Sequence, residues 1–475
     1  MMNTLPGNKI RIVCTIGPAS DSPETLERMI QAGMNVARLN FSHGDFDIHA
    51  RVIERIRAAS EKTGRRVAIL ADLPGPKMRI GDFGKEPVVL EKGARFILTT
   101  QDVVGDGQQV SITMKELPQA VKPGDMLYLN DGLIQLRVEG VEGDEIHCIV
   151  ITGGELRSRK GLNVPGIDLG TSAFTERDRE CMAFALAHGV DAVSQSFVSS
   201  AEDVEAVRRA AREMGHDPFV IAKIERSKII DVIDSIIEAA DGIMVARGDL
   251  GVELPIEKIA IAQKYITRRA NIQGRPVITA TQMLESMTHN RRPTRAEATD
   301  VANAILDGTD AVMLSEESAM GDYPLESVEM LVRIATATEP YIHRGQFMQP
   351  FVAADDASPV DILASSIDEI VQKMKPSAVF APTDSGTTAR SVTRYRLPCW
   401  IFAPSTSEKT CRDLMFSWGV YPICRKDKPE QWGGLVKGYL QDFGIRGDSA
   451  LVVEGPSKAH PVANHRLELI DLAGH

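Results

Sequence analysis

A regular alternation of short β-branched runs with longer amphipathic stretches constrains the fold more than any other feature of the sequence. Eight such pairs are predicted before residue 346, with one long interruption after the third run. A series of strand–helix pairs forms a parallel sheet, because each helix returns the chain to the same edge. The alternation predicts an α/β protein built on a (β/α)8 TIM barrel, and a doubly wound open sheet is the competing architecture. The predicted strands span residues 10–17, 34–41, 67–72, 190–198, 219–224, 242–246, 276–280 and 310–314, and the predicted helices span residues 23–32, 48–62, 175–188, 201–214, 229–240, 256–271, 295–306 and 325–335.

The rest of the chain predicts two further domains. The interruption contains strand-like runs separated by glycine- and proline-containing turns, including Asn130-Asp131-Gly132, and indicates a small all-β domain inserted into the barrel. Such an insertion can act as a lid over the barrel mouth. The tail begins with a polar linker at 353–358 and then returns to an α/β pattern. The expected domains are a barrel formed by residues 1–72 and 169–345, an inserted β lid domain at 73–168, and a C-terminal α/β domain at 346–475.

The composition restricts the partners of the protein. The formal net charge is −11, from 54 basic and 65 acidic residues, and the chain has no long basic run. This balance argues against nucleic acid and against an anionic membrane surface as partners. No apolar stretch reaches the length of a transmembrane helix, and the N-terminus lacks the apolar core of a signal peptide. The six cysteines form no C-x-x-C pair, which is typical of a cytoplasmic protein and indicates neither a disulfide framework nor a zinc site.

Two of the apolar runs, 221–225 and 241–252, end in charged residues. The first delivers Lys223 and Glu225, and the second delivers Asp249. Burying such groups is unfavourable unless they pair or bind a metal. These runs therefore predict a divalent cation held by Glu225 and Asp249, with Lys223 free to act on an anionic substrate.

Further charged and polar residues follow the other predicted barrel strands. The carboxyl ends of barrel strands meet at one mouth, where active sites form. Arginines, lysines and carboxylates gathered there suit an anionic phosphate and a metal. The strand-end segments are 38–44, 72–79, 223–225, 247–249, 279–282 and 315–317.

Seven segments in these positions carry a resemblance to a known family. They read VCTIGPAS (13–20), GMNVARLNFSHG (33–44), AKIE (222–225), DGIMVARGDLG (241–251), ATQMLESM (280–287), PTRAE (293–297) and DGTDAVMLS (307–315). They resemble the signature segments of pyruvate kinase, in the same order and across the whole barrel. The resemblance extends to the inserted domain.

The resemblance implies a reaction and a set of site residues. Phosphoenolpyruvate would donate its phosphoryl group to ADP, giving pyruvate and ATP, a step of glycolysis. Glu225 and Asp249 would hold Mg²⁺ or Mn²⁺, and Lys223 would neutralise charge on the transferring phosphoryl group. Arg38 would clamp the phosphate. Thr281 would contact the substrate and lie on the route of the proton to the enolate.

The resemblance also implies a nucleotide site and a contact with the substrate carboxylate. Backbone N–H groups of Gly248 and Asp249 would face that carboxylate. The residues matching positions near the ADP phosphates are Asn40, His43, Arg79 and Lys160. Closure of the lid would bring Asp131 and Lys160 over the barrel mouth and exclude water. The roles of Ser315 and Glu317 remain open, and Glu316 stands where the family usually has glycine.

The segment after the third strand departs from the usual pattern of the family. Many pyruvate kinases hold K⁺ with oxygens at the positions of Asn40, Ser42, Asp72 and Leu73. The usual D-T-K-G-P-E-I-R-T reads D-L-P-G-P-K-M-R-I here, so that Lys77 replaces an acidic residue. Two unit charges about 4 Å apart repel by roughly 4 kcal/mol at an effective dielectric near 20, which disfavours K⁺ beside the ammonium. The sequence therefore resembles a potassium-independent branch, and we expect Lys77 to replace K⁺.

The tail contains a predicted phosphate-binding loop. Hydroxyl groups and a glycine precede a helix-like run, as in a phosphate nest. In the family this position holds the phosphate of an allosteric sugar phosphate, although a monophosphate, a nucleotide or no effector are all alternatives here. The resemblance also implies a homotetramer. The loop residues are Thr383, Ser385, Gly386, Thr387 and Thr388.

Two other classes of function are alternatives. One is another metal-dependent barrel enzyme acting on phosphoenolpyruvate or pyruvate enolates, such as a lyase or mutase, which would lack the inserted domain and the nucleotide residues. The other is a non-catalytic homologue that binds effector through the tail. The intact Lys223, Glu225, Asp249 and Thr281 argue against it.

Overall fold

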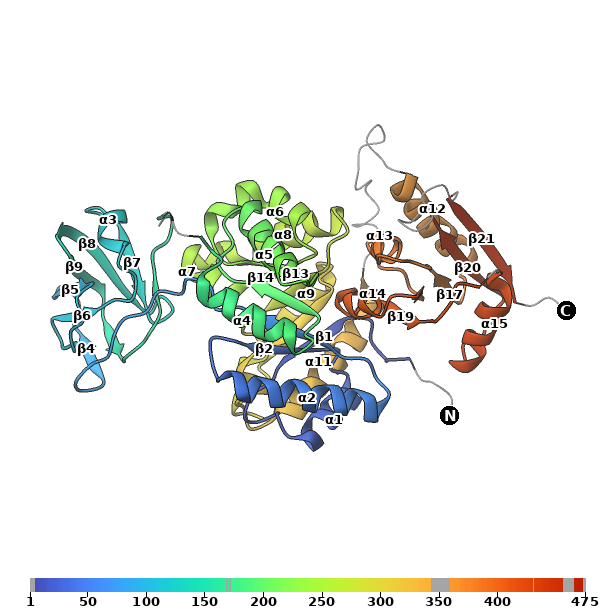
Figure 1. Ribbon diagram of the computed structural model, residues 1–475, viewed down its shortest axis with the longest axis horizontal. Helices are drawn as coiled ribbons and strands as arrows, with labels where there is room; N and C mark the ends of the chain where they lie inside the picture. Colours follow the sequence, from blue (N-terminus) through green and yellow to red (C-terminus); the bar gives the residue numbers. More distant parts are fainter. Residues whose placement is uncertain are drawn as a thin grey trace.

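The computed structural model describes residues 5–167, 170, 172–342, 359–429, 431–455 and 465–472. Three bodies lie in a row, with the inserted domain at one end, the barrel in the middle and the C-terminal domain at the other end (Figure 1). The predicted domain boundaries at 168–169 and 345–346, and the predicted linker at 353–358, lie outside the described residues.

Eight parallel strands close into a barrel, which confirms the (β/α)8 prediction and excludes the open sheet. The strands are short and buried because helices cover the outer face while side chains fill the interior. Some neighbouring strands end level with one another, as the pairing of Asn40 with Asp72, the last residues of two adjacent strands, illustrates. In order around the barrel they are β1 (Arg11–Thr15), β16 (Ala311–Leu314), β15 (Val277–Ala280), β14 (Gly242–Ala246), β13 (Phe219–Ile224), β12 (Ala192–Gln195), β3 (Ala68–Asp72) and β2 (Val36–Asn40).

Several of the outer helices begin at a capping residue that the sequence supplies. The side chain of Ser22 caps the first helix, and Thr175 and Thr294 form capping boxes with Asp178 and Glu297. Such caps fix the residues at which these helices begin. The covering helices are α1 (Pro23–Ala32), α2 (Phe46–Thr63), α4 (Glu176–Ala187), α5 (Ala201–Glu213), α6 (Ile233–Ala239), α8 (Ile259–Ile272), α9 (Arg295–Leu306) and α11 (Pro324–Thr338).

Two short helices at the mouth were not among the predicted elements as full helices. They are α7 (Arg247–Glu253), directly after β14, and α10 (Glu316–Ala319), directly after β16. The sequence predicted only a helical turn at Gly248. Both are too short to show a helical period, so hydrophobic spacing could not reveal them.

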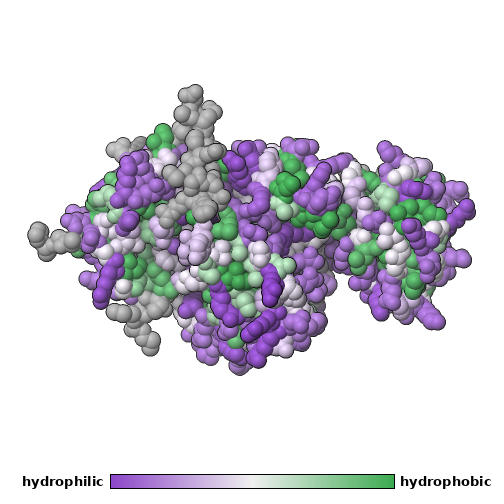
Figure 2. All heavy atoms as spheres, turned by 180° about the vertical axis from the view of Figure 1, so that it is seen from behind, coloured by the Kyte–Doolittle hydropathy of each residue, from purple (hydrophilic) through white to green (hydrophobic). Residues whose placement is uncertain are grey.

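The inserted domain is a separate lobe joined to the barrel by a narrow waist (Figure 2). It contains a six-stranded and a two-stranded sheet with its own core around Phe96. The predicted turn at Asn130, Asp131 and Gly132 has left-handed backbone at all three residues. Its elements are β4 (Val88–Leu90), β5 (Arg95–Thr99), β6 (Gln109–Ser111), α3 (Leu117–Ala120), β7 (Met126–Leu129), β8 (Ile134–Glu142), β9 (Glu145–Thr152), β10 (Gly154–Leu156) and β11 (Leu162–Asn163).

The C-terminal domain is an α/β layer structure, as predicted. Its five-stranded sheet has the order β19-β18-β17-β20-β21, and its last strand is antiparallel. A buried ion pair between Arg396 and Asp310, 2.9 Å apart, joins it to the barrel. The elements are α12 (Pro359–Met374), β17 (Ala378–Phe380), α13 (Thr387–Thr393), β18 (Trp400–Ser405), α14 (Glu408–Asp413), β19 (Val420–Cys424), α15 (Trp432–Asp442), β20 (Ser449–Glu454) and β21 (Arg466–Asp471).

None of the helices in the described part of the chain combines the length and the apolar character that a membrane crossing requires.

Candidate active site

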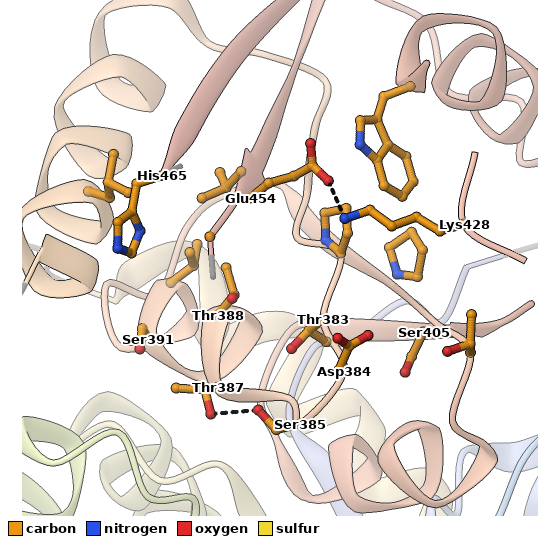
Figure 3. A pocket seen from close by; sticks show the side chains of 18 of the residues that line it. Thr383, Asp384, Ser385, Thr387, Thr388, Ser391, Ser405, Lys428, Glu454 and His465 are labelled. Carbon is orange, nitrogen blue, oxygen red and sulfur yellow. Dashed lines mark hydrogen bonds and ion pairs between the residues drawn. The ribbon is translucent and has the colours of Figure 1, made fainter. Parts of the chain in front are cut away.

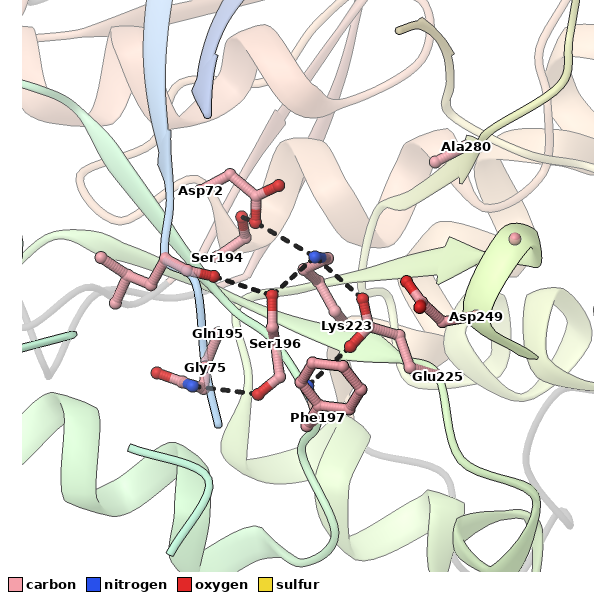
Figure 4. Close-up of polar contacts among 12 residues, drawn as sticks. Asp72, Gly75, Ser194, Gln195, Ser196, Phe197, Lys223, Glu225, Asp249 and Ala280 are labelled. Carbon is pink, nitrogen blue, oxygen red and sulfur yellow. Dashed lines mark hydrogen bonds and ion pairs between the residues drawn. The ribbon is translucent and has the colours of Figure 1, made fainter. Parts of the chain in front are cut away.

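Lys223 lies at the centre of the polar cluster in the barrel mouth (Figure 4). Its Nζ donates to Ser196 Oγ at 2.6 Å and lies 2.8 Å from Glu225 Oε1 and 3.3 Å from Asp72 Oδ1. The side chain is 11% exposed, so Lys223 is largely buried among these three partners. Lys223 and Glu225, both predicted from the end of the 221–225 run, are therefore in direct contact.

Arg38 approaches the cluster from β2. Its Nε donates to Asp72 Oδ2 at 2.9 Å, and its Nη1 donates to Thr15 Oγ1 at 2.8 Å. Asp72 also accepts a hydrogen bond from Ser194 Oγ at 2.7 Å. This carboxylate thus holds Arg38 and Lys223 side by side, although two cations would otherwise repel.

The electrostatics of the cluster follow from burial and pairing. Burial raises the pKa of Asp72, but the cations of Lys223 and Arg38 outweigh it and hold that pKa below its ordinary value. Burial lowers the pKa of Lys223, and the carboxylates of Asp72 and Glu225 outweigh it, so that its pKa is raised. Lys223 is therefore a cation at neutral pH.

The pKa of Glu225 is shifted upward, in the opposite direction to that of Asp72. Burial is the main cause of its raised pKa, and the nearby carboxylate of Asp249 adds to it, against the effect of Lys223. Glu225 Oε2 accepts the backbone N–H of Phe197 at 2.7 Å. Asp249 stands on the first turn of α7, and its carboxylate points toward Glu225 (Figure 4). Two carboxylates so close together repel each other when both are ionised. A hard divalent cation, which prefers oxygen ligands, would relieve that repulsion.

Thr281 and Gly248 are joined by a direct hydrogen bond. Gly248 N–H donates to Thr281 Oγ1 at 2.8 Å, and that hydroxyl donates to the carbonyl of Ala280 at 2.6 Å. Thr281 has φ +67, a conformation that a β-branched residue rarely adopts. Arg247 holds it there by donating to the Thr281 carbonyl at 2.7 Å. The N–H of Gly248 that was expected to face a substrate carboxylate is thus bonded to Thr281.

Lys77 pairs with a predicted metal ligand. Its Nζ lies 3.7 Å from Asp249 Oδ1. The predicted K⁺ ligands lie at the ends of β2 and β3, where Asn40 Oδ1 accepts the backbone N–H of Ser42 and the Leu73 carbonyl accepts Ser196 Oγ. The buried side chain of Leu73 belongs to the barrel core.

Of the predicted nucleotide residues, His43 lies close enough to Arg79 for that cation to affect its pKa. Burial is the largest cause of the lowered pKa of His43, and the cations of Arg79, Arg38 and Lys77 add to it. His43 therefore lies among cations, as a polyphosphate site requires. The backbone of Arg79 bridges to Gly161, and the carbonyl of Lys160 accepts Ile80 N–H at 3.0 Å. Arg79 and Lys160 thus belong to adjacent antiparallel segments of the inserted domain.

Glu317, in the segment after β16, has a structural role. Its carboxylate accepts the backbone N–H of Ser315 at 2.7 Å and of Leu284 at 3.0 Å, and the side chain is buried. Burial raises its pKa. Glu316 is exposed and close enough to His43 to affect its pKa. Glu317 therefore ties two mouth loops together.

The predicted phosphate loop of the C-terminal domain borders a cavity of about 440 Å³ (Figure 3). Gly386 has φ +83, and its N–H donates to Thr383 Oγ1 at 2.9 Å. Ser385 and Thr387 share a hydroxyl hydrogen bond of 2.9 Å. The cavity lining includes all the predicted loop residues except Gly386, together with Arg425, Lys428 and His465.

Several residues of the cluster were missed by the sequence reasoning. They are Thr15, Ser194 and Ser196, which bond to Arg38, Asp72 and Lys223. The polar run Ser194-Gln195-Ser196 at the end of the fourth barrel strand was a signal that could have revealed two of them. Thr15 ends the first strand in the same way.

Comparison with known proteins agrees with this architecture and site. The family model described as "Pyruvate kinase, barrel domain" matches residues 7–328, and that described as "Pyruvate kinase, alpha/beta domain" matches residues 361–459. The pyruvate kinase of Thermococcus litoralis is 46% identical over 476 residues, covering 98% of this chain and 99% of that protein. The pyruvate kinase of Geobacillus stearothermophilus is 44% identical over 418 residues, covering 87% of this chain and 71% of that protein.

Among solved structures, the crystal structure of a pyruvate kinase from Cryptosporidium parvum aligns with a TM-score of 0.91 at 33% identity. The alignment covers 98% of this chain and 96% of that chain. Barrel, lid and C-terminal domain are therefore all shared. With two family models and relatives of more than 40% identity in agreement, the chain belongs to the pyruvate kinase family.

Proposed function

We propose that this protein transfers a phosphoryl group from phosphoenolpyruvate to ADP, giving pyruvate and ATP, as a step of glycolysis. The observation that carries the proposal is the cluster in which Lys223 lies 2.8 Å from Glu225 and 3.3 Å from Asp72 at the barrel mouth. A fixed ammonium beside carboxylates suits a reaction whose main demand is charge neutralisation and positioning.

Each residue of the cluster has a distinct role in the proposal. Mg²⁺ or Mn²⁺, held by Glu225 and Asp249, would supply positive charge to the substrate oxygens. Lys223 remains protonated and donates to the transferring phosphoryl group, because its raised pKa keeps the ammonium charged. Arg38 clamps the same group.

The enolate left after transfer needs a proton. Thr281 stands at the mouth with its hydroxyl bonded to Gly248 N–H and the Ala280 carbonyl. A threonine hydroxyl is too weak an acid to be the only donor, so we propose that it relays a proton from water. The backbone turn at Gly248 and Asp249 orients the carboxylate of the substrate.

The nucleotide would bind between the barrel mouth and the lid. His43 and Arg79 face the phosphates of ADP, and Lys160 joins them when the lid closes, with Asn40 supporting the loop that carries His43. Exclusion of water by the lid protects the phosphoryl group from hydrolysis.

The direct test is pyruvate formation measured by coupling to lactate dehydrogenase. We expect turnover that requires phosphoenolpyruvate, ADP and Mg²⁺ together, and a loss of at least about 100-fold in Lys223→Met. Pyruvate formed at the same rate without ADP would indicate a lyase or mutase instead. No turnover, with effector still bound at the C-terminal domain, would indicate a non-catalytic homologue.

We propose further that Lys77 supplies the positive charge that K⁺ provides in many relatives. The lysine stands where the family usually has an acidic residue, and its ammonium lies near the metal carboxylate of Asp249. Turnover in a buffer whose only monovalent cation is a bulky organic one is the measurement. A large fall in rate that KCl restores would refute this part of the proposal alone.

The cavity beside Thr383, Ser385, Gly386, Thr387 and Thr388 is proposed to bind a phosphorylated effector. Arg425 and Lys428 bring cations to its lining, although Lys428 already pairs with Glu454 at 3.0 Å. Activation or inhibition by a panel of sugar monophosphates and nucleotides, and its loss in Thr387→Glu, is the test.

A homotetramer in the cytoplasm completes the proposal. Three large apolar side chains near the start of α8 are exposed to solvent: Ile256 at 77%, Ile261 at 69% and Tyr265 at 43%. Exposing such apolar surface to water is unfavourable, and self-association would bury it. Within the described residues the six cysteines form no disulfide, which suits a reducing compartment. Light scattering on a sizing column measures the mass, and Ile261→Glu should lower it. Val104→Glu, an equally exposed lid position, should leave it unchanged.

A further inference from the structure

A second cluster of ligating side chains lies far from the barrel mouth, in the C-terminal domain. Glu408 and Cys411 stand three residues apart on α14, and Cys424 is the last residue of the neighbouring strand β19. One oxygen of Glu408 and the two sulfur atoms all lie within 4.8 Å of one another. Among the residues that the structure describes, this is the one set of three such ligand atoms gathered so closely.

The three groups point toward each other. The two sulfur atoms and one carboxylate oxygen of Glu408 lie close enough together to be drawn onto a single ion. Ligand atoms gathered this closely need only small shifts to surround an ion. Cys411 is fully buried and Cys424 is exposed, so the cluster has one rigid side and one side open to solvent.

Two arginines orient the carboxylate. Arg66, from the barrel, donates to Glu408 Oε1 at 3.2 Å and to Oε2 at 3.0 Å. Arg412 donates to Oε1 at 3.4 Å. A carboxylate that accepts such contacts keeps further lone pairs, and second-shell donors of this kind fix the geometry of metal ligands.

We propose that Glu408, Cys411 and Cys424 bind one divalent cation of the zinc class, with water as the fourth ligand. Two thiols and one carboxylate are ligands of zinc, whereas Mg²⁺ prefers oxygen alone, so the site would discriminate against the cation expected at the barrel mouth. Binding releases both thiol protons to the solvent. The one negative charge then left on the ion and its ligands is offset by Arg66 and Arg412.

Nothing in the sequence indicated this site, because its cysteines are scattered and form no C-x-x-C pair. Cys411 and Cys424 belong to different elements, and only the packing of α14 against β19 brings them together. The contacts of Arg66 also give the site a structural consequence. Arg66 joins the barrel to Glu408 and to the carbonyl of Pro422, so a bound cation would stiffen the surface at which the two domains meet.

The experiment uses the full-length protein, fully reduced with a phosphine and then freed of reductant under anaerobic conditions. Co²⁺ is the first probe, because cobalt bound by thiolates gives strong near-ultraviolet charge-transfer absorption that oxygen ligands at the barrel mouth do not give. We expect that band at one equivalent of Co²⁺, its loss on adding one equivalent of Zn²⁺, and its persistence in excess Mg²⁺.

Matched variants localise the band. Cys424→Ser changes an exposed side chain and should abolish it, and Glu408→Gln should weaken Zn²⁺ binding at least about tenfold in competition with a chromophoric chelator. Cys399→Ser, in the same domain but outside the cluster, should behave as the unaltered protein. Cys424→His should keep Zn²⁺ binding, because imidazole is also a zinc ligand.

Three results would overturn the proposal. They are no thiolate band in the reduced protein, an equal band in Cys424→Ser, or, when air is admitted afterwards as the oxidant, a loss of both thiols to a Cys411–Cys424 disulfide that Zn²⁺ does not prevent. The last result would assign the pair to thiol oxidation instead of metal binding. Catalytic activity is not part of the readout, so the outcome is independent of the proposed reaction.

Discussion

Nζ of Lys77 lies 3.7 Å from Oδ1 of Asp249. Lys77 belongs to the segment that leads from β3 into the lid, whereas Asp249 belongs to α7 at the barrel mouth. Both side chains are partly exposed, at 32% and 24%, so this pair alone adds at most about 1 kcal/mol to stability. The pair matters because it holds the ammonium of Lys77 where the lid, the proposed metal ligands and the proposed phosphate site meet.

Replacing Lys77 with methionine should create a dependence on K⁺. Without its ammonium the site lacks one positive charge, so we expect turnover in K⁺-free buffer to fall about tenfold or more. Added KCl should restore part of the loss, because the repulsion of roughly 4 kcal/mol that disfavours K⁺ is gone. Lys85→Met, at an exposed lid position, is the control. Full activity of Lys77→Met without K⁺ would contradict the assigned role.

Removing either proposed metal carboxylate should weaken cation binding and turnover together. For Glu225→Gln and Asp249→Asn we expect a fall in turnover of at least about 100-fold. The fraction of free Mn²⁺, measured by electron paramagnetic resonance, should rise in both variants. Glu257→Gln, an exposed carboxylate just beyond α7, is the matched control. Unchanged Mn²⁺ affinity in both variants would place the cation elsewhere.

Thr281→Val should separate phosphoryl transfer from proton transfer. Valine keeps the shape but leaves Gly248 N–H without its acceptor. We expect deuterium exchange at the methyl group of pyruvate, followed by NMR, to fall by about 100-fold. Phosphoryl transfer to ADP should fall less, and Thr281→Ser should recover much of the exchange. The control is Thr299→Val on α9. An equal fall in both steps would indicate a purely structural role.

Asp413 should make stability depend on pH. Burial raises its pKa to about 6, against the opposing cation of Lys409, which pairs with it at 2.7 Å. The folded state therefore binds more protons than the unfolded state between about pH 4 and about pH 6. The stabilising contribution is fully present below the unfolded pKa of 3.8 and is lost as the pH rises through about 6.

Asp413→Asn removes that titration, and the difference amounts to roughly 3 kcal/mol at most. We expect the variant to melt at a higher temperature than the unaltered protein at about pH 7.5, and to show little gain at about pH 5. Scanning fluorimetry at both pH values measures this, with the exposed Asp442→Asn as control. A gain of the same size at both pH values would contradict the raised pKa.

The barrel was predictable because its signals are local. Strands such as Phe219–Ile224 are continuous apolar runs, and helices such as Arg295–Leu306 begin at a capping residue that the sequence shows directly. The strand ends then follow, and with them the position of Lys223, Glu225 and Asp249 at one mouth. The short helices α7 and α10 lacked a period, so they were predicted as turns or not at all.

The sequence by itself determined the barrel, the inserted β domain and the identity of the charged groups at the strand ends, because periodicity and capping act between residues close in the chain. Only the tertiary structure decided which group each of these meets. Lys77 pairs with Asp249, Ser196 accepts from Lys223, and Cys424 meets Glu408, each across separate elements. Such contacts depend on how the helices and strands pack in three dimensions. The spacing of residues along the chain does not determine that packing.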